Sequence, residues 1–417
     1  MIIGFDGSRA FVAERTGTEN YSYQLLRHLA QIDKKNQYLV YLRPGNRVPN
    51  WKTVIAGQEA GGVIAKQEAR SRSVILGNEE TPESNQDPGQ ARMTNYGWPE
   101  NFEFKKIDYK RLWTQVGLGL QTFSDKLDIL FVPAHTLPII RKPGLKTVMT
   151  VHDLGAEYLP AAHQLKQRLY LRFITNYQLN SATALIAVSE STKKDLVSEG
   201  TYREKISVIY EGFDSSLFNP KNSDLQDNVL KQFDLESKKY FLFVGTIQPR
   251  KNLGNLIKAF KGFLNILPQT DIKLVLAGGK GWLSDEIFEL PKKLGIEDRV
   301  KFLGRVPDQQ LPVLYSGALA LTYPSLYEGF GLPILEAMAC GCPVIASNTS
   351  SLPEVLGSAG ILVNPLLVEQ ILEAMLKIAE NDRLRDNLIE KGNVQVKKFS
   401  WEKCAHETLK LLESLKE

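Results

Sequence analysis

Short apolar runs alternate with helical patterns along most of this chain. In the first half, six runs have the length and composition of buried strands: Ile2–Phe5, Tyr38–Leu42, Ile129–Val132, Thr147–Val151, Leu185–Val188 and Val208–Tyr210. The helix expected after the first run begins at a capping box, Thr16-Gly-Thr-Glu19. Because strand–helix alternation produces right-handed crossovers, the pattern predicts a mainly parallel sheet.

The same pattern starts again in the second half of the chain. Six further runs are strand-like, with helical patterns between them: Tyr240–Val244, Leu274–Ala277, Val300–Leu303, Leu319–Tyr323, Val344–Ala346 and Ile361–Val363. Two separate series of strands predict an α/β protein with two doubly wound, Rossmann-like parallel sheets.

The composition between the runs predicts the domain boundaries. A polar stretch between Phe213 and Lys238 separates an N-terminal domain, 1–213, from a C-terminal domain, 214–398, and a last amphipathic helix occupies 399–417. The segment 58–100 is rich in polar residues and has little periodicity. It is interpreted as a flexible surface insertion, and a mobile lid is the alternative.

Composition and charge narrow the class of protein. The chain has 417 residues, 43% hydrophobic and 24% charged, with 51 Lys plus Arg against 47 Asp plus Glu. The net charge of +4 argues against a nucleic-acid binder, and 3 cysteines argue against a disulfide framework. The opening residues lack a basic, apolar leader, and no apolar run is long enough to span a membrane. A cytoplasmic protein is expected.

The densest motif runs from Tyr323 to Ala346. A strand is followed by a glycine-containing loop, and Pro333 suits the first turn of the helix that comes next. Glycines at 329 and 331 allow the backbone to approach a ligand, and the helix N-terminus favours an anion such as phosphate. Glu328 on the loop and Glu336 in the helix can bind sugar or ribose hydroxyls. The alternative is an ordinary strand–loop–helix with two solvated carboxylates.

Two further motifs follow predicted strands at their carboxyl ends, where such folds bind ligands. Arg250 and Lys251 come shortly after the strand that ends near Gly245, and both can bind phosphate oxygens. His152 and Asp153 follow a strand of the first half, and the histidine can hydrogen-bond a ligand or transfer a proton. Solvated cations and a structural histidine are the alternatives.

The first loop, 6–18, ends in a Gly-Thr pair before a helix and can present backbone N–H groups to phosphate. Other signatures are missing from the sequence. It contains neither a P-loop nor an Asp-x-Asp motif, and Cys340 and Cys342 have no second pair of ligands nearby, so no metal site is predicted.

Taken together, these motifs resemble the family-4 retaining glycosyltransferases of the GT-B fold. Glu328 and Glu336 match the family's pair of glutamates, and Gly245-Thr-Ile-Gln-Pro-Arg-Lys-Asn252 matches its basic donor motif. Val151-His-Asp153 matches its first-domain histidine. The resemblance covers nearly the whole chain except the segment 58–100. It implies two Rossmann-like domains that face a cleft, with the last helix crossing back to the first domain.

The resemblance also implies roles for individual residues. The catalytic residues would be Glu328, His152, Arg250 and Lys251. The donor would be bound by Gly17, Thr18, Gly245, Arg250, Lys251, Glu328, Gly329, Phe330, Gly331, Leu332 and Glu336. The two cations would offset the charge of the leaving diphosphate, and Glu336 would hold the ribose. No cofactor or metal is implied, only a GDP- or UDP-linked sugar as co-substrate.

The acceptor side is less defined by the sequence. His135 and Asp153 are expected near the acceptor, which would be a glycan or a lipid-linked saccharide. A predicted helix over 164–174 mixes cations with apolar residues. It is interpreted as a helix with one buried face, and peripheral contact with an anionic membrane surface is the alternative.

Three functional hypotheses remain at this point. The first is a retaining hexosyltransferase, with mannose favoured from the family resemblance. The second is another sugar-nucleotide enzyme such as an epimerase, and the third is a non-catalytic nucleotide-sugar-binding scaffold subunit. The intact set of charged motif residues favours the first. The sequence does not identify the base, the sugar, the acceptor, the linkage or the oligomeric state.

Overall fold

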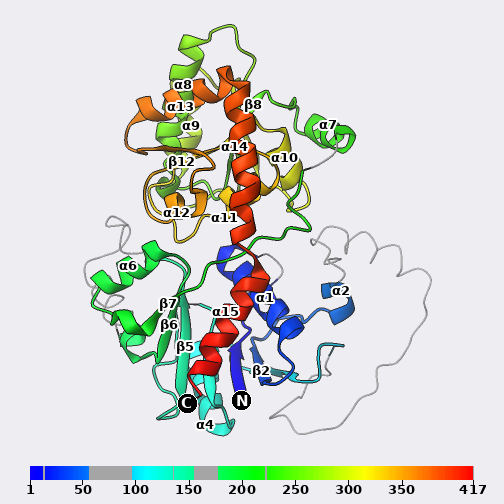
Figure 1. The fold of residues 1–417 in the computed structure, drawn as a ribbon, viewed down its shortest axis with the longest axis vertical. Helices are drawn as coiled ribbons and strands as arrows, with labels where there is room; N and C mark the ends of the chain where they lie inside the picture. Colours follow the sequence, from blue (N-terminus) through cyan, green and yellow to red (C-terminus); the bar gives the residue numbers. More distant parts are fainter. Residues whose placement is uncertain (13–14, 56–95, 135, 155–176, 221–222, 417) are drawn as a thin grey trace, which may run out of the picture. The chain divides into compact units, whose positions relative to one another are not determined.

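The computed structural model describes residues 1–12, 15–55, 96–134, 136–154, 177–220 and 223–416 (Figure 1). The chain divides into two compact units. Unit 1 comprises Met1–Val188, Lys193–Tyr210 and Trp401–Glu417, and unit 2 comprises Ser189–Thr192 and Glu211–Ser400. The main division, at Tyr210, lies three residues before the predicted boundary at 213. Of the predicted insertion, 58–100, only residues 96–100 are described. The predicted basic helix over 164–174 lies wholly outside the described residues.

Unit 1 contains a seven-stranded parallel sheet in the order β3-β2-β1-β4-β5-β6-β7. Its strands are β1 (Ile2–Asp6), β2 (Gln37–Leu42), β3 (Phe102–Lys106), β4 (Ile129–Val132), β5 (Lys146–Val151), β6 (Ala184–Ala187) and β7 (Ile206–Val208). In the register, Phe5 of the central strand pairs with Val40 on one side and Phe131 on the other. The strand order reverses between β1 and β4, which is a topological switch point.

Strand β3 was not among the predicted strands, and its pattern explains why. Phe102 and Phe104 are buried, whereas Glu103 and Lys105 between them are only half-buried. This alternation is typical of an edge strand, while the central strands β4 and β6 have continuous apolar runs. The other edge strand, β7, also has a polar residue, Ser207, and the run predicted at Val208–Tyr210 overlaps it at Val208 only. The end of the predicted flexible insertion is also wrong, because Trp98 is buried, packs on Trp51 and donates a hydrogen bond to the Pro49 carbonyl.

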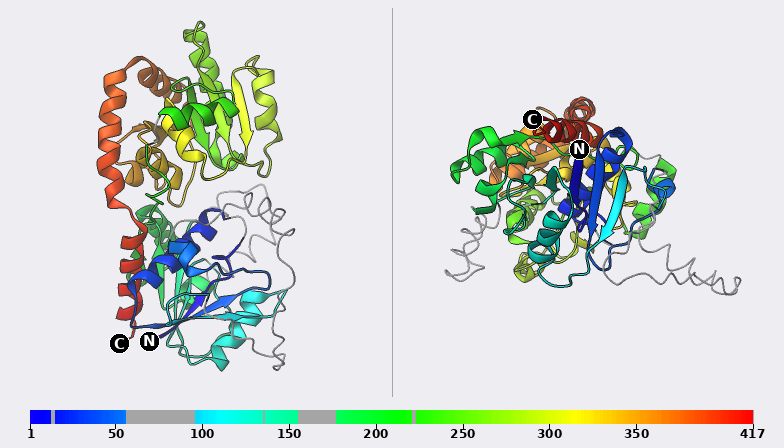
Figure 2. Two further views of the ribbon diagram at one scale, coloured as in Figure 1. Left: turned by 90° about the vertical axis from the view of Figure 1, so that its right-hand side faces the viewer. Right: turned by 90° about the horizontal axis from the view of Figure 1, so that it is seen from below.

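The helices of unit 1 are α1 (Gly17–Ile32), α2 (Trp51–Ile55), the π-helix η1 (Trp113–Leu118), α4 (Gly119–Ser124), α6 (Glu190–Ser198), the 3₁₀ turn η2 (Arg203–Lys205) and α15 (Trp401–Ser414). The predicted capping box at Thr16 is confirmed at the start of α1. Helix α15 packs along α1 (Figure 2), where the rings of Tyr21 and Trp401 are 5.8 Å apart. Just after the C-terminal end of α15, the Leu415 carbonyl accepts a hydrogen bond from the Lys146 ammonium.

Unit 2 contains a six-stranded parallel sheet in the order β10-β9-β8-β11-β12-β13. Its strands are β8 (Tyr240–Val244), β9 (Lys273–Ala277), β10 (Val300–Gly304), β11 (Ala320–Tyr323), β12 (Val344–Ser347) and β13 (Ile361–Val363). All six match predicted strands to within one residue at either end. The order reverses between β8 and β11, so the loops after these two strands meet at a second switch point.

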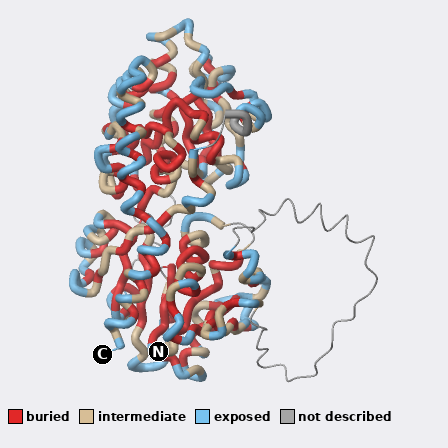
Figure 3. Tube along the Cα trace, turned by 45° about the vertical axis from the view of Figure 1, so that its right-hand side comes forward, coloured by how far each residue is buried: buried red, intermediate tan, exposed pale blue. Residues whose placement is uncertain are grey.

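Helices cover the sheet of unit 2. They are α7 (Ser223–Gln232), the 3₁₀ turn η3 (Pro249–Lys251), α8 (Leu253–Ile266), α9 (Asp285–Lys293), α10 (Leu311–Gly317), α11 (Leu332–Ala339), α12 (Leu352–Leu356), α13 (Val368–Glu380), α14 (Asp382–Gln395) and the 3₁₀ turn η4 (Val396–Lys398). Figure 3 shows the buried segments, in red, concentrated within each unit. The continuous apolar strands therefore form the two cores that the sequence predicts.

Candidate functional site at the switch point of unit 2

The loop after β8 makes a close approach to the loop after β9. Gly245 has a φ of +146° and Gly278 a φ of +155°, both in the region that favours glycine. A Cβ atom added to Gly278 would lie 1.9 Å from the Gly245 carbonyl oxygen. Sequence reasoning selected Gly245 but missed Gly278. The run Gly-Gly-Lys-Gly directly after a buried strand is the signal that identifies it.

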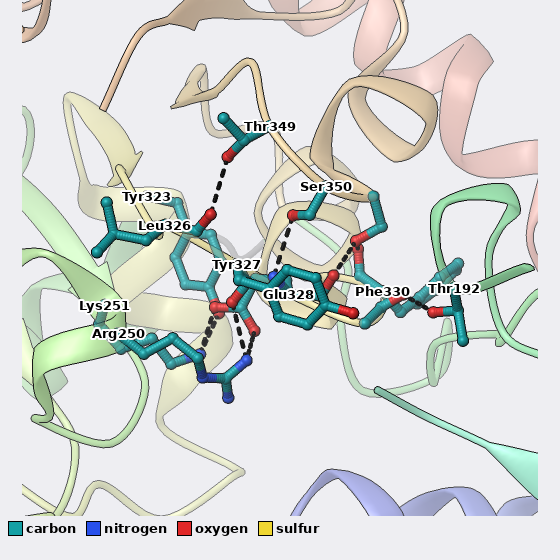
Figure 4. Close-up of polar contacts among 12 residues, drawn as sticks. Thr192, Arg250, Lys251, Tyr323, Leu326, Tyr327, Glu328, Phe330, Thr349 and Ser350 are labelled. Atoms are coloured by element: carbon teal, nitrogen blue, oxygen red, sulfur yellow. Dashed lines mark hydrogen bonds and ion pairs between the residues drawn. The ribbon is translucent and has the colours of Figure 1, made fainter. Parts of the chain in front are cut away.

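Two cations and one carboxylate meet between the loops after β8 and β11 (Figure 4). The Lys251 ammonium lies 2.5 Å from Glu328 Oε1 and 2.9 Å from the Tyr323 hydroxyl oxygen, and donates to both. Arg250 donates to Glu328 Oε2 at 3.3 Å and to the Tyr327 carbonyl at 2.8 Å. The structure thus brings Glu328 to two adjacent cations that lie 78 and 77 positions before it in the sequence, because β8 and β11 are neighbouring strands.

The group is buried and carries a net positive charge. The side chains of Lys251 and Glu328 are each 9% exposed, and that of Arg250 is 19% exposed. Burial acts to raise the pKa of Glu328, but the charges of Lys251 and Arg250 outweigh it, so its pKa lies below the usual value. One ionised carboxylate against two cations leaves one positive charge in a weakly solvated place, which suits an anionic ligand.

Hydroxyl groups from the loop after β12 fix the backbone around Glu328. Ser350 Oγ accepts from the Glu328 N–H at 3.0 Å. Ser351 Oγ lies 3.0 Å from the Glu328 carbonyl and 2.7 Å from the Phe330 carbonyl, and Thr349 donates to the Leu326 carbonyl. Sequence reasoning missed these serines, and the signal for them is the Asn-Thr-Ser-Ser run directly after a strand. These hydrogen bonds fix the backbone conformation of the loop from Leu326 to Phe330.

The loop continues into helix α11 as the sequence predicts. Gly331, the residue that caps the helix, has a φ of +114°, and Leu332 and Pro333 form the first turn. Gly341 follows the helix with a φ of +68°, as expected for a glycine at a helix end. The backbone from Gly329 to Leu332 therefore leads directly to the N-terminus of an eight-residue helix.

The two motif carboxylates have different partners. Glu336 is half-buried in α11 and accepts a 2.8 Å hydrogen bond from the Tyr315 hydroxyl of α10. Burial raises the pKa of Glu336 to about 7, although the hydrogen bond from Tyr315 acts in the opposite direction. Glu328 is thus held ionised by cations, whereas Glu336 is close to half protonated at neutral pH.

The histidine of unit 1 lies where the sequence predicts, directly after β5. His152 Nε2 is 3.1 Å from the Pro133 carbonyl, and the ring packs edge-on against Tyr21, with 4.6 Å between ring centroids. These contacts position the ring at the carboxyl end of the sheet, between β5 and β4. Asp153 is adjacent and half-buried. His135 lies outside the described residues.

The glycine–threonine pair forms the first turn of α1. Gly17 is exposed, and a Cβ added to it would meet nothing within 4 Å, so the space beside it is open. Thr18 is half-buried. Glu19 in the same turn accepts from the Thr16 N–H at 3.2 Å and forms a 2.8 Å ion pair with Arg9. A carboxylate of the chain itself therefore already interacts with this helix N-terminus.

Within the described ranges, no group of three or more His, Cys, Asp or Glu side chains is arranged to hold a metal ion. No helix in the described part of the chain is both long enough and apolar enough to cross a membrane.

Solved structures place the fold in a known class. The chain aligns over 100% of its length with 99% of a sucrose-phosphate synthase from Thermosynechococcus elongatus, with a TM-score of 0.70 and 19% identity. It aligns over 99% of its length with all of HepE from Anabaena, solved with UDP and glucose, with a TM-score of 0.69 and 18% identity. The fold is that of the GT-B glycosyltransferases.

Sequence comparisons then give the family. The model "Glycosyltransferase Family 4" matches residues 15–217, and the model "Glycosyl transferases group 1" matches 226–395. An O-antigen chain mannosyltransferase B of Escherichia coli is 35% identical over 264 residues, which are 63% of this chain and 69% of that protein. The O-antigen chain mannosyltransferase RfbU of Salmonella typhimurium is 33% identical over 55% of this chain and 59% of its own length. The chain belongs to family 4 of the glycosyltransferases.

Proposed function

We propose that this protein is a retaining glycosyltransferase that transfers a hexose, with mannose favoured, from a GDP- or UDP-linked donor. The acceptor is a hydroxyl group of a glycan or a lipid-linked saccharide. The observation that carries the proposal is the buried group of Arg250, Lys251 and Glu328 at the switch point of unit 2. The choice of mannose is supported by the chain's similarity to the two O-antigen mannosyltransferases.

Arg250 and Lys251 are the residues that act on the leaving group. In the reaction, the bond between the anomeric carbon and the donor phosphate oxygen breaks, and a new bond forms to the acceptor oxygen. The electron pair leaves with the diphosphate, whose growing charge the two cations stabilise. The acceptor proton passes to the leaving phosphate, so the atoms and charges balance without an enzyme nucleophile.

The loop after β11 binds the sugar and the ribose in this proposal. Glu328 accepts hydrogen bonds from sugar hydroxyls, and the backbone from Gly329 to Leu332 donates to the donor. Glu336 accepts from the ribose hydroxyls when it is ionised. The roles of His152, Gly17 and Thr18 towards the donor, and of His135 and Asp153 towards the acceptor, stay predictions.

Metal independence belongs to the same proposal. The charge that a divalent cation would otherwise supply to the diphosphate is present in Arg250 and Lys251, which are fixed by their contacts with Glu328. A cytoplasmic location and peripheral contact with the inner membrane surface are also proposed, because a lipid-linked acceptor would be found there.

The test is transfer from a labelled donor. The purified chain is incubated with GDP-mannose or UDP-glucose, labelled in the sugar, and with a lipid extract of the source cells. We expect label in the acceptor fraction, with retained anomeric configuration by NMR. Lys251→Met and Arg250→Gln should each lose about 100-fold or more in kcat. Lys239→Gln is the matched control, since Lys239 forms only an exposed pair with Asp271.

Two results would contradict the proposal. An inverted product would remove the retaining mechanism, and full activity in both Lys251→Met and Arg250→Gln would remove these residues from the site. For the carboxylate, Glu328→Gln is preferable to alanine. Glutamine keeps the side-chain volume and one acceptor oxygen, although both variants remove the charge, and loss of one partner from a buried ion pair costs about 3–5 kcal/mol. Urea unfolding of the variant therefore accompanies the activity measurement.

A further inference from the structure

Unit 1 contains a cavity of about 380 Å³ that none of the motifs explains. It lies beyond the carboxyl ends of β2 and β3, next to the loop that follows β4. Its lining includes Arg43, Tyr109, Lys110, Trp113, Gln115 and Thr136. A cavity of this size, with a few polar groups at the carboxyl edge of a parallel sheet, has the dimensions of a small-molecule site.

The two cations of the cavity are exposed. None of the ion pairs among the described residues of unit 1 includes Arg43 or Lys110. A cavity of similar size in unit 2 differs in this respect, because Asp234 and Asp271 neutralise lysines in its lining. Asp6 is buried within reach of the Arg43 charge and balances it in part, so the positive charge of the cavity that attracts an anion rests mainly on Lys110.

Aromatic rings lie beside these cations. Trp113 is 3% exposed, and the Arg43 guanidinium carbon lies 5.2 Å from the centre of its ring. Tyr109 is 41% exposed and presents ring surface to the cavity. In the described part of the chain, Trp113 Nε1 is buried without a hydrogen-bond acceptor. An exposed aromatic ring beside cations suits a ligand with both C–H faces and charged oxygen atoms, as an anionic saccharide has.

One wall of the cavity has an uncommon backbone conformation and is fixed by hydrogen bonds. Leu112 adopts a left-handed conformation with a φ of +53°, and the π-helix η1 begins at the next residue. Gln115 of that helix donates to the Leu137 carbonyl and accepts from the Ile139 N–H, which ties the wall to the loop after β4. Left-handed residues and π-helical turns cost energy and are frequent at functional sites.

We infer that this cavity binds an anionic saccharide as part of the acceptor. The sugar ring packs on the exposed ring of Tyr109, and its phosphate or carboxylate group binds Arg43, which lies over Trp113, and Lys110. Gln115 and Thr136 supply polar contacts for the hydroxyl groups. The inference rests on the proposed function, since it gives the acceptor unit a substrate class.

The experiment measures binding to the full chain by saturation-transfer NMR with GDP present to occupy the donor site. The probes are mannose 1-phosphate, galacturonic acid and methyl α-mannoside, so that phosphate, carboxylate and neutral ligands are compared. We expect one of the anionic sugars to bind about tenfold or more tightly than the neutral one, and the stronger anion identifies the group. Arg43→Gln and Lys110→Gln should each weaken that ligand about tenfold.

The controls separate this site from the donor site. Lys126→Gln, at an exposed lysine outside the cavity, should leave the affinity unchanged, and Tyr109→Ala should weaken the anionic sugar. Three results would overturn the inference. They are equal affinity for the three probes, no binding of any probe at a concentration on the order of 10 mM, and unchanged affinity in Arg43→Gln. Nucleotide binding measured separately in each variant tests the proposed function, so one can fail without the other.

Discussion

At the scale of single residues, the two motif glutamates differ in protonation although both are acceptors in the proposed site. Glu328 contacts two cations and stays ionised, while Glu336 contacts only a tyrosine hydroxyl and titrates near neutral pH. Their spacing in the sequence places both on one loop–helix segment, but it does not reveal the partners. The cations of Glu328 come from the loop after the neighbouring strand β8, whereas Tyr315 comes from helix α10, which packs on α11.

A prediction about stability follows from the raised pKa of Glu336. Its pKa of about 7 lies above the value of 4.5 for an ordinary glutamate, so the folded chain holds a proton that the unfolded chain has released. The free energy of unfolding contributed by this group therefore falls as the pH rises from 4.5 to 7. Glu336→Gln, which does not titrate, should have a higher Tm than the natural chain at pH 8.

The pH dependence of that difference is the decisive part of the measurement. Near pH 4.5 both side chains are largely uncharged when folded, so the gap in Tm between Glu336→Gln and the natural chain should become small. Calorimetry at both pH values measures it. A difference in Tm that stays constant with pH would show that burial does not destabilise the Glu336 anion. A natural chain with a higher Tm than Glu336→Gln at pH 8 would show that the pKa of Glu336 is not raised.

At the scale of elements, the sequence predicts strands well where both faces are buried. Such strands have continuous apolar runs, and all six strands of unit 2 were predicted to within a residue at each end. Strand β3 was missed because its Phe-Glu-Phe pattern buries one face only, and Trp98 was assigned to the insertion because the polar composition around it hid its packing. The hydroxyl contacts of Ser350 and Ser351 depend on how two loops meet, which local pattern does not encode.

The contact between the loops after β8 and β9 gives a prediction at this scale. Gly278→Ala would force its Cβ onto the Gly245 carbonyl, at a backbone angle that alanine rarely adopts. We expect a loss of about 2 kcal/mol or more in the free energy of unfolding, together with weaker nucleotide binding. Gly279→Ala is the matched control, because a Cβ there meets nothing within 4 Å. Equal stability of the two variants by urea unfolding would contradict this account.

At the scale of the whole molecule, the class was predictable because the motifs all follow strands of two separate sheets. The GT-B fold and the family are confirmed by the comparisons. The acceptor side was much less predictable. The cavity beside Trp113 is built from three loops that are distant in sequence, and neither its aromatic nor its basic residues form a recognisable motif.

A prediction for the whole molecule concerns nucleotide binding. Thermal unfolding is measured with GDP, UDP and ADP at about 1 mM, without and with EDTA; a ligand present at 100 times its Kd adds about 2.7 kcal/mol. We expect one nucleotide to raise the Tm and EDTA to leave that shift unchanged, since Arg250 and Lys251 supply the positive charge. A shift that EDTA abolishes would contradict metal independence, and no shift with any nucleotide would favour a scaffold role.

The path of the chain through the two units has a consequence for synthesis. Helix α15 packs on α1, yet the whole of Glu211–Ser400 lies between unit 1's earlier segments and that helix. As the chain leaves the ribosome, unit 2 is therefore complete before Trp401 can cover Tyr21. The part of α1 that α15 covers stays open to water for the time needed to translate an entire domain. Unit 1 begins folding first and finishes last.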